Sequence, residues 1–494
     1  MLSGLEVGTV TGPIDQDISS IACDSRKANP GAIFFALHGE KLNGATFIPD
    51  ALQKGAIAVA SEAPREMGRP RDLTWVELLP GSQRRALAQA SANFYGHPTN
   101  ALKLVGITGT NGKTTTTFLV DSILQAAGFT TGLIGTTGYR TPAGSRKPVT
   151  TTPESLDLQE MFAEVRDAGG TYTVLEASSH ALAMERLWGC HFDAAIFTNL
   201  TRDHLDYHKT FEDYFSAKRR LFEGTGASAP DWSVINSDDP YAPRLEGLAK
   251  RTLTYGLKGS PDVTTKEYAL SFGGLRFTAE TPAGKIDVRS ALVGRINVYN
   301  ILGAIGGAIG LEVPIAKIEE GIAGLELVPG RFQRIDEGQP FLVVVDYAHT
   351  DDALRNLITA ARELNPTGRV ITVFGAGGDR DRTKRPLMGE AAGSLSDLVI
   401  LTSDNPRSED PLRIINDVVV GLQKVNAKYR IEPDREVALE MALEEARPGD
   451  MVLLAGKGHE TYQILRDRTL DFDEREKARA ILRRKGYLKK SAGQ

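Results

Sequence analysis

The stretch GITGTNGKTTTT, residues 106–117, combines residue types that are suited to holding phosphate groups. It lies between a predicted strand and a predicted helix. In that setting glycines let backbone N–H groups close on phosphate oxygens, and the helix N-terminus adds positive potential. Lys113 can reach the terminal phosphates, and Thr114 can bind Mg²⁺. Ile107 stands where the general phosphate-loop pattern has its first glycine, but the context favours a phosphate loop over a simple glycine-rich turn.

Further polar residues follow in the same part of the chain. Glu176 in LEASSH comes after a predicted strand and could complete a Mg²⁺ shell, although an ordinary strand-end acid fits equally well. His204, Asp206 and His208 in TNLTRDHLDYH are typical of a helix start and a turn, and a metal site is the less favoured interpretation on spacing alone. Lys218 in SAKRRLF, taken alone, is typical of a solvated basic helix face.

The stretch LTSDNPRSEDP, residues 401–411, ends an apolar run with acid, amide and guanidinium groups around a proline. Asn-Pro commonly opens a turn, so these residues alone indicate a solvated loop after a buried strand. Other predicted strands of the chain also end in polar residues. In a parallel sheet the carboxyl ends of the strands are where ligands bind.

Apolar strands alternate with helical patterns, which predicts an α/β fold with mainly parallel sheets covered on both faces. One series of strands is LKLVGIT, TVLEASS, AAIFTNL and WSVINSDD, and the helix TTTTFLVDSILQAAG follows the first of them. A later series is FLVVVDYAHT, VITVFGAGGDRD, LVILTSDNPR and MVLLAGKGHE. Near the start, GAIFFAL and GAIAVAS precede the helical pattern SQRRALAQASANFYG.

The length of 494 residues is too great for a single core. The stretches HPTNALKL and ELVPGRFQ interrupt the pattern and mark two boundaries. We therefore predict three α/β domains, at residues 1–97, 98–329 and 330–494.

The composition argues against several classes of protein. Acidic residues number 63 and basic residues 58, which gives a net charge of -5 and no basic footprint for nucleic acid. The first residues lack the pattern of a signal peptide, and no apolar run approaches the roughly 18 residues that could span a bilayer. Cys23 and Cys190 have no CxxC partner, which predicts buried free thiols. We expect a cytoplasmic monomer with no nucleic-acid partner and no membrane insertion.

The chain resembles the Mur ligases of peptidoglycan synthesis. The motifs GTNGKTT, TTPES, EASSHAL, NLTRDHLDYH, YFSAKRRLF, GRINVYN, VPGRFQ, DYAHTDDAL, GGDRDRTKRP, DNPR and GKGHE occur in the order seen in that family. The similarity runs from DSRKANPGAIFFAL to GKGHE and is closest to the diaminopimelate-adding members, the MurE group. It implies an N-terminal UDP-binding domain, a central domain like a P-loop ATPase and a Rossmann-like C-terminal domain.

The resemblance also implies the reaction. ATP phosphorylates the D-glutamate side-chain carboxylate of UDP-N-acetylmuramoyl-L-alanyl-D-glutamate. The amino group of meso-diaminopimelate then attacks the acyl phosphate, and phosphate is released. The implied partners are therefore ATP, the UDP-N-acetylmuramoyl dipeptide, meso-diaminopimelate and Mg²⁺. No enzyme nucleophile is needed, so the protein positions groups and neutralises charge.

Site residues are carried over from the family motifs. The residues implied for ATP are Gly109, Thr110, Asn111, Gly112, Lys113, Thr114, Thr115, Asn297, Arg331 and Asp346. The implied catalytic residues are Lys113, Glu176, His204 and Lys218, and the implied Mg²⁺ ligands are Thr114, Glu176, His204 and Lys218 with an N-carbamylated side chain. The implied contacts to the UDP-muramoyl dipeptide are Ser25, Thr151, Thr152, Ser178 and Arg186. The implied contacts to diaminopimelate are Arg380, Asp404, Asn405, Pro406, Arg407, Gly456 and Glu460.

Some alternatives stay open at this point. A lysine-adding ligase shares every part except the amino-acid pocket, and a nucleotide-binding regulatory module would close on ATP without forming a bond. Folylpolyglutamate synthase shares the phosphate loop, but the first domain with its DSR motif and the HLDYH motif argue against it. The chain departs from the family pattern at Asn43, Thr150 and Met184, which bears on substrate contacts rather than on the reaction.

Overall fold

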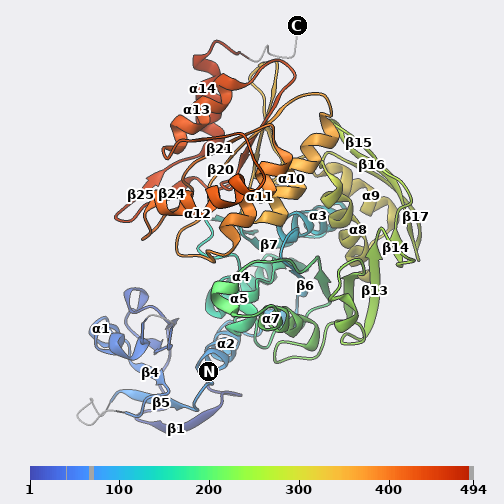
Figure 1. Cartoon of the computed structure of the whole chain (residues 1–494). Helices are drawn as coiled ribbons and strands as arrows, with labels where there is room; N and C mark the ends of the chain where they lie inside the picture. The colour runs from blue at the N-terminus through green and yellow to red at the C-terminus, as the bar shows by residue number, and fades with distance from the viewer. Residues whose placement is uncertain (40–41, 66–71, 489–494) are drawn as a thin grey trace.

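Three α/β units follow one another along the chain (Figure 1). The computed structural model describes residues 1–39, 42–65 and 72–488. The first unit, in blue, lies at one end of the molecule, and the third, in orange and red, lies at the other. The predicted fold class is confirmed, while the predicted boundaries near residues 97 and 329 stay predictions.

The first unit is a five-stranded sheet in the order β1-β5-β4-β3-β2. Its strands are β1 (Val7–Thr11), β2 (Ser20–Ala22), β3 (Ala32–Phe35), β4 (Ala58–Ser61) and β5 (Thr74–Leu78). β1 pairs with β5 in the antiparallel direction and the other pairs are parallel. The helices α1 (Ile48–Gln53) and α2 (Gln83–Phe94) pack on this sheet. The strands predicted in GAIFFAL and GAIAVAS are therefore confirmed.

The central unit has a larger sheet with a parallel middle and antiparallel edges. Its parallel strands, in spatial order, are β14 (Val263–Thr264), β13 (Arg251–Gly256), β12 (Trp232–Asn236), β11 (Ala194–Phe197), β6 (Lys103–Thr108), β10 (Tyr172–Glu176) and β7 (Thr131–Gly135). One edge continues into β8 (Gly138–Thr141) and β9 (Gly144–Arg146), and the other into β15 (Ala269–Ser271), β16 (Gly274–Thr281) and β17 (Gly284–Ser290). The sequence predicted the parallel middle but not these edges.

Helices cover both faces of the central sheet, as a buried parallel sheet requires. Successive residues of β6 point to opposite faces, so Val105 packs with α3 (Lys113–Ala126) and α8 (Arg295–Gly310). Leu104 packs on the other face with α4 (Ser155–Asp167) and α7 (Phe211–Glu223). This arrangement holds the start of α3 directly beyond the carboxyl end of β6.

The third unit is a six-stranded sheet in the order β18-β19-β23-β20-β21-β22. Its strands are β18 (Gln333–Ile335), β19 (Leu342–Asp346), β20 (Val370–Phe374), β21 (Leu398–Leu401), β22 (Tyr429–Ile431) and β23 (Met451–Ala455). The helices α10 (Asp351–Leu364), α11 (Lys384–Leu395) and α12 (Pro411–Lys424) cover one face, and α13 (Arg435–Glu445) and α14 (Glu474–Arg484) cover the other. A short hairpin of β24 (Tyr462–Ile464) and β25 (Thr469–Asp471) lies beyond β23.

Two smaller expectations have different outcomes. Cys190 is buried as predicted, but Cys23, which follows the edge strand β2 of the first sheet, is only partly buried. Among the residues that the structure describes, no helix combines the length and the apolar character needed to cross a membrane.

Candidate active site

The loop between β6 and α3 has the backbone that a phosphate loop needs. Gly109 has a φ of 146° and Gly112 a φ of 91°, which L-residues with a side chain rarely adopt. A Cβ at Gly109 would lie 1.9 Å from Oγ1 of Thr198, and one at Gly112 would lie 2.3 Å from Oδ1 of Asn300. Ile107 is fully buried within β6 and packs in the hydrophobic core of the central unit, so it belongs to the strand and not to the loop. The loop therefore starts two residues later than in the general pattern.

Lys113 is the first residue of α3 and folds back over this loop. Its Nζ atom donates hydrogen bonds to the carbonyl oxygens of Gly109, at 2.9 Å, and Thr110, at 2.8 Å. Enclosure in the cleft lowers the pKa of Lys113. The next residue, Thr114, accepts a hydrogen bond from the guanidinium of Arg331 at 3.1 Å. A residue of the third unit thus touches the phosphate loop directly.

A cleft runs beside the loop, between the central and third units. We call it the interdomain cleft. It is lined by Thr110, Asn111, Gly112, Lys113, Thr114, Thr136, Thr151, Glu176, Ser178, Ser179, Asp203, His204, Tyr214, Lys218, Arg331, Tyr347, His349 and Ala353. The cleft brings together all the predicted catalytic residues and all the predicted metal ligands, although they come from separate strands and helices.

Glu176 ends β10 with its carboxylate held in place. Its Oε1 atom accepts a hydrogen bond from the backbone N–H of Thr136 at 2.9 Å, and Oε2 accepts one from the Thr136 hydroxyl at 3.0 Å. The residue is 1% exposed. A buried carboxylate at the end of a parallel strand has the position and the chemistry of a Mg²⁺ ligand.

Lys218 is buried in α7, whereas its sequence context alone suggested an exposed basic face. Its Nζ atom donates a hydrogen bond to the carbonyl oxygen of Gly109 at 2.7 Å and lies 4.4 Å from the ring centre of Tyr214. Burial and the nearby charge of Lys113 hold the pKa of Lys218 well below its ordinary value. The solvated-face interpretation is therefore wrong, because α7 turns this residue toward the phosphate loop.

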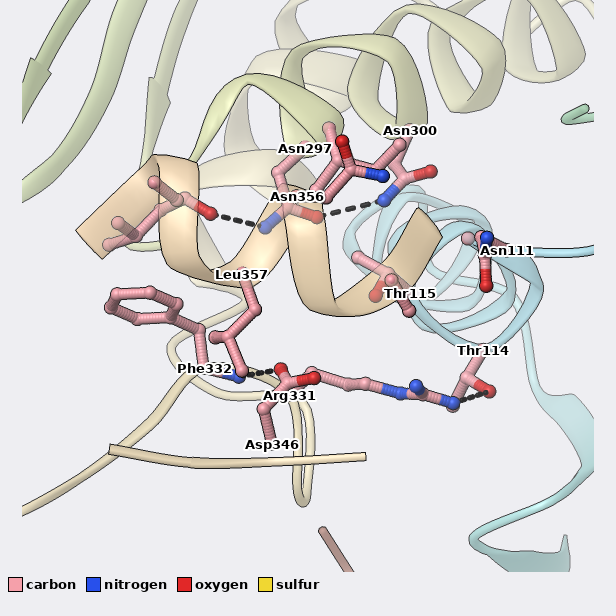
Figure 2. Close-up of a pocket in the computed structure, with 15 residues that line it drawn as sticks. Asn111, Thr114, Thr115, Asn297, Asn300, Arg331, Phe332, Asp346, Asn356 and Leu357 are labelled. Carbon is pink, nitrogen blue, oxygen red and sulfur yellow. Dashed lines mark hydrogen bonds between the residues drawn. The ribbon is translucent and has the colours of Figure 1, made fainter. Parts of the chain in front are cut away.

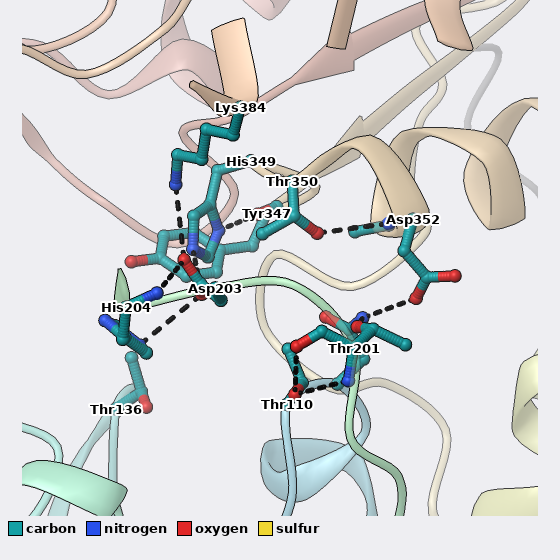
Figure 3. Close-up of polar contacts among 12 residues, drawn as sticks. Thr110, Thr136, Thr201, Asp203, His204, Tyr347, His349, Thr350, Asp352 and Lys384 are labelled. Carbon is teal, nitrogen blue, oxygen red and sulfur yellow. Dashed lines mark hydrogen bonds and ion pairs between the residues drawn. The ribbon is translucent and has the colours of Figure 1, made fainter. Parts of the chain in front are cut away.

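The sequence did not predict a cluster of titratable side chains around Asp203, which lines this cleft. Asp203 lies 3.3 Å from Nζ of Lys384, 3.4 Å from Nε2 of His204 and 3.7 Å from Nε2 of His349 (Figure 3). Burial alone would raise the pKa of Asp203, but Lys384 and the two histidines hold it well below its ordinary value. Burial lowers the pKa of His204 to about 3, although the Asp203 carboxylate acts in the opposite direction.

Other contacts join the same two units. The amide of Asn111 in the phosphate loop donates to Oδ2 of Asp352, at the start of α10, at 2.7 Å. The guanidinium of Arg202 donates to the hydroxyl of Thr383 at 2.9 Å. The motifs that contain Asp203, His349 and Lys384 were recognised in the sequence, but nothing in the sequence showed that these residues meet.

A second pocket adjoins the phosphate loop between α8 and α10 (Figure 2). We call it the Asn297 pocket. Seven residues predicted to bind ATP line it: Asn111, Gly112, Thr114, Thr115, Asn297, Arg331 and Asp346. Asn297 is fixed by a hydrogen bond to the carbonyl oxygen of Val293 at 2.7 Å and accepts one from Asn300 at 2.8 Å. The carboxylate of Asp346 accepts from the backbone N–H of Phe332 at 2.7 Å and of Ala348 at 2.8 Å.

Of the residues predicted to contact the muramoyl dipeptide, Thr151 and Ser178 line the interdomain cleft, and Thr152 and Arg186 are joined to them by hydrogen bonds. The Thr152 hydroxyl donates to Oγ of Ser178 at 3.0 Å, and Arg186 donates to the carbonyl oxygen of Thr152 at 2.8 Å. Thr151 lines the cleft itself. Ser25 lies in the first unit, where its carbonyl oxygen accepts from Lys54 at 3.0 Å, and it lines neither pocket described above.

The three departures from the family pattern have structural roles of their own. Asn43 caps a short turn by accepting from the backbone N–H of Ala45 at 3.0 Å. The Thr150 hydroxyl donates to the carbonyl oxygen of Thr152 at 3.0 Å. The sulfur of Met184 lies 3.6 Å from the guanidinium of Arg186.

The residues predicted to bind diaminopimelate gather in the third unit at the carboxyl ends of β20, β21 and β23. We call Arg380, Asp404, Asn405, Pro406, Arg407, Gly456 and Glu460 the third-domain cluster. The amide of Asn405 donates to Oε2 of Glu460 at 3.0 Å. A Cβ at Gly456 would lie 3.8 Å from Oδ2 of Asp404. The cluster adjoins the interdomain cleft through Tyr347, whose ring centre is 4.9 Å from that of His459.

Two arginines stand close together at the same place. A Cβ at Gly377 would lie 3.2 Å from Nη1 of Arg407 and 3.7 Å from Cγ of Arg380. Burial and the charge of Arg380 lower the pKa of Arg407. Arg407 also has a φ of 51°, a strained backbone of the kind found at functional sites. The Arg407 guanidinium donates to the carbonyl oxygen of Gly378 at 2.7 Å, and with the charge of Arg380 nearby it offers a positively charged site suited to a carboxylate.

Family models match the chain in three successive segments. The model for "Mur ligase family, catalytic domain" matches residues 17–95, that for "Mur ligase middle domain" residues 107–308, and that for "Mur ligase, glutamate ligase domain" residues 330–458. Together these segments cover most of the chain. The protein is a member of the Mur ligase family.

Individual relatives agree with this assignment. A Mur ligase from Solibacter usitatus (strain Ellin6076), named UDP-N-acetylmuramoyl-L-alanyl-D-glutamate--2,6-diaminopimelate ligase, is 53% identical over 95% of this chain and 94% of that protein. A solved structure with the same name is 34% identical, with a TM-score of 0.63, and the match covers 96% of this chain and 97% of that one. The MurF ligase from Thermotoga maritima in complex with ADP is 20% identical with a TM-score of 0.63 over 94% of this chain and 97% of that one, which shows the shared fold.

Proposed function

We propose that this Mur ligase joins meso-diaminopimelate to UDP-N-acetylmuramoyl-L-alanyl-D-glutamate and converts ATP to ADP and phosphate. The names of the similar proteins support the two substrates. The observation that carries the proposal is the third-domain cluster. In this cluster the charges of Arg380, Asp404 and Glu460 all act on the pKa of Arg407. His459, the residue before Glu460, packs against Tyr347 of the interdomain cleft.

ATP would bind with its triphosphate on the phosphate loop and its nucleoside in the Asn297 pocket. The backbone N–H groups of the loop and the N-terminus of α3 would hold the phosphates. Lys113 can swing from its present carbonyl partners to the terminal phosphate, because those contacts are ordinary hydrogen bonds to the loop itself. Its positive charge would stabilise the transferring phosphoryl group.

The donor set of the interdomain cleft suits Mg²⁺. The described residues contain no cluster of three or more His, Cys, Asp or Glu side chains ready for a metal. Thr114 and Glu176 would instead hold one ion together with phosphate oxygens, and His204 and a carbamylated Lys218 would hold a second. When bound, Mg²⁺ neutralises charge on the phosphate oxygens.

Carbamylation of Lys218 follows from its surroundings as well as from the family motif. The low pKa of Lys218 keeps a share of its amine neutral, and a neutral amine can attack CO₂ and lose a proton to form a carbamate. The product is an anion, which a cation would attract where an ammonium group would repel it. The buried position of the side chain protects the carbamate from bulk water.

The reaction then needs two displacements in one cleft. A carboxylate oxygen of D-glutamate attacks the γ-phosphorus of ATP, and ADP leaves. The neutral amine of the incoming amino acid attacks the acyl carbon, and phosphate leaves from the tetrahedral intermediate. Thr151, Ser178 and Arg186 would orient the acyl group, while the third-domain cluster would orient the amine. Positioning two bound reactants in this way is itself a large source of catalysis.

Selection against lysine would fall to Arg407. Diaminopimelate has a carboxylate at its far end that lysine lacks, and a guanidinium fork binds a carboxylate through two hydrogen bonds. Lysine would leave the half-buried Arg407 charge without that partner. The acidic side chains of Asp404 and Glu460 would receive the distal ammonium group. These assignments favour the diaminopimelate reaction over its lysine-adding alternative.

Amino-acid-dependent phosphate release tests the proposal. Purified protein with Mg²⁺, ATP and the UDP-N-acetylmuramoyl dipeptide should release phosphate when meso-diaminopimelate is added and much more slowly with L-lysine. A preference for lysine, or ATP binding without amino-acid-dependent release, would contradict it. We place the reaction in the cytoplasm and expect the working enzyme to be a monomer; light scattering of the working enzyme tests the second point.

A further inference from the structure

Lys457 lies directly behind the third-domain cluster, and no role was predicted for it. Its side chain is 0% exposed. The Nζ atom lies 2.6 Å from Oδ1 of Asn405 and 3.0 Å from the carbonyl oxygen of Tyr462. It also lies 3.1 Å from Oδ1 of Asp404 and 3.3 Å from Oε2 of Glu460. The ammonium group is therefore enclosed by acceptors and does not face the space that a substrate would occupy.

The first consequence concerns the orientation of Asn405. An ammonium group can only donate hydrogen bonds, so the amide oxygen of Asn405 must face Lys457. The same oxygen accepts from the backbone N–H of Ile464 at 2.9 Å. The amide nitrogen is thereby directed toward Oε2 of Glu460 at 3.0 Å. Lys457 and the Ile464 N–H thus together fix which end of Asn405 meets the carboxylate.

The second consequence concerns charge. Asp404 and Glu460 lie close together behind the surface of the cluster, and two uncompensated carboxylates there would be costly. Burial alone would raise the pKa of Asp404, but Lys457 and Arg435 lower it below its ordinary value, so this carboxylate stays ionised. Lys457 offsets one of the two negative charges. One negative charge therefore remains to bind an ammonium group of the amino acid, while the nearby arginines suit its carboxylate.

Arg435 also lies behind the third-domain cluster, but its hydrogen bonds go to groups other than the Asn405 amide. It is paired with Glu474 at 2.9 Å, and both side chains are 0% exposed. It donates to the carbonyl oxygens of Ser403 at 3.2 Å and Ala455 at 2.8 Å, which fixes the ends of β21 and β23. Since these strand ends are held independently, removing the Lys457 charge should disturb the polar groups of the cluster more than its backbone.

We propose that Lys457 is a positioning residue for the acceptor amino acid, which fixes Asn405 and balances Asp404 and Glu460 so that the cluster accepts one ammonium group and one carboxylate. This inference rests on the proposed function. Without the lysine, the Asn405 amide oxygen keeps only the Ile464 N–H as a donor and is held less firmly, and the repulsion between the carboxylates can be relieved only by taking up a proton or another cation. Binding of diaminopimelate should weaken, while ATP and the muramoyl dipeptide, which bind outside this cluster, should be unaffected.

The test compares Lys457→Met, which keeps the length of the side chain without the charge, with Lys457→Gln, which keeps a hydrogen-bond donor. Lys424→Met is the matched control, because Lys424 is an exposed lysine of the same unit that pairs with Glu390 at 2.8 Å. For each protein we would measure KM for all three substrates, kcat and the melting temperature. Titration calorimetry of meso-diaminopimelate, with the muramoyl dipeptide and a non-hydrolysable ATP analogue present, gives a Kd that does not depend on turnover.

We expect Lys457→Met to raise KM and Kd for meso-diaminopimelate at least tenfold, with Lys457→Gln less affected and KM for the other two substrates unchanged. An unchanged KM for diaminopimelate, or equal rises for all three substrates, would overturn the inference. So would failure of both variants to fold, since Lys457 would then serve the fold rather than the cluster. If the wild-type protein shows no diaminopimelate-dependent release, the proposed function fails instead.

Discussion

The interdomain cleft and the third-domain cluster are assembled in different ways. The cleft depends on contacts between two units, such as Arg331 with Thr114 and Asp203 with Lys384. The cluster lies within one unit, where Lys457 and other buried side chains hold its parts together. The cleft should therefore change whenever the two units separate, whereas the cluster should persist. Variants in the two regions should give separate kinetic defects.

The largest effect is expected at the phosphate loop. Lys113→Ala removes the positive charge that would meet the transferring phosphoryl group. Loss of a comparable preorganised group costs about 2.7–4 kcal/mol, or roughly a hundred- to a thousandfold in kcat. The change should lower kcat with either amino acid and leave the preference between them intact. Steady-state phosphate release measures both quantities, and Lys103→Ala, an exposed lysine at the other end of β6, is the control. Wild-type turnover of Lys113→Ala at saturating ATP would rule out the assigned role.

Lys218→Ala should be almost as damaging, because it removes the side chain predicted to become a carbamate. A small carboxylic acid such as acetate or propionate can fill the gap with a carboxylate, so added acid should restore part of the activity of Lys218→Ala and none of Lys113→Ala. Carbon-13 NMR of the wild-type enzyme in labelled bicarbonate should show a carbamate carbon that Lys218→Ala lacks. Absence of both the rescue and the signal would remove the case for carbamylation.

The third-domain cluster should give a different kind of defect. Arg407→Ala removes the group that would bind the distal carboxylate. Truncating one partner of a buried charge pair costs about 2–5 kcal/mol, which is at least roughly thirtyfold in kcat/KM for meso-diaminopimelate. Release with L-lysine should change little, because lysine has no such carboxylate. Parallel assays with the two amino acids measure the preference, and a variant that keeps its full preference for diaminopimelate would show that another residue selects the substrate.

The parts that the sequence predicted are those encoded over a few neighbouring residues. The glycines around Lys113, the apolar run of β6 and the helix after it fix the phosphate loop locally, and the strands that end at Glu176 and Asp346 were found for the same reason. The family motifs then brought distant segments into one predicted site.

The parts that the sequence missed depend on distant segments or on the direction of a side chain. Asp203 and Lys384 are 181 residues apart, and their contact exists only because the third unit lies against the central one. Lys218 is followed by Arg219 and Arg220, which is the pattern of an exposed basic helix face, and only the packing of α7 shows that Lys218 is buried. In the antiparallel strands β15 to β17 apolar and polar residues alternate as they do in many surface hairpins. The sequence therefore did not show that these strands extend the parallel sheet.

The smallest expected effect separates the two regions most clearly. Asp203→Asn keeps the shape of the side chain but removes the charge that pairs with Lys384 across the two units. The pair lies where two units meet, so a small separation of the units would let water reach the remaining Lys384 charge. The cost should therefore be only about 1.4 kcal/mol, or tenfold in KM for ATP. Lys384→Met, which removes the other charge of the pair, should raise KM for ATP by the same factor. The double variant should raise it no further than either single variant. The preference for diaminopimelate over lysine should not change, since the third-domain cluster contains neither residue. Asp167→Asn, an exposed carboxylate of the central unit, is the control. A loss of amino-acid preference in Asp203→Asn would mean that the cluster also depends on domain contact, and that the two regions do not act separately.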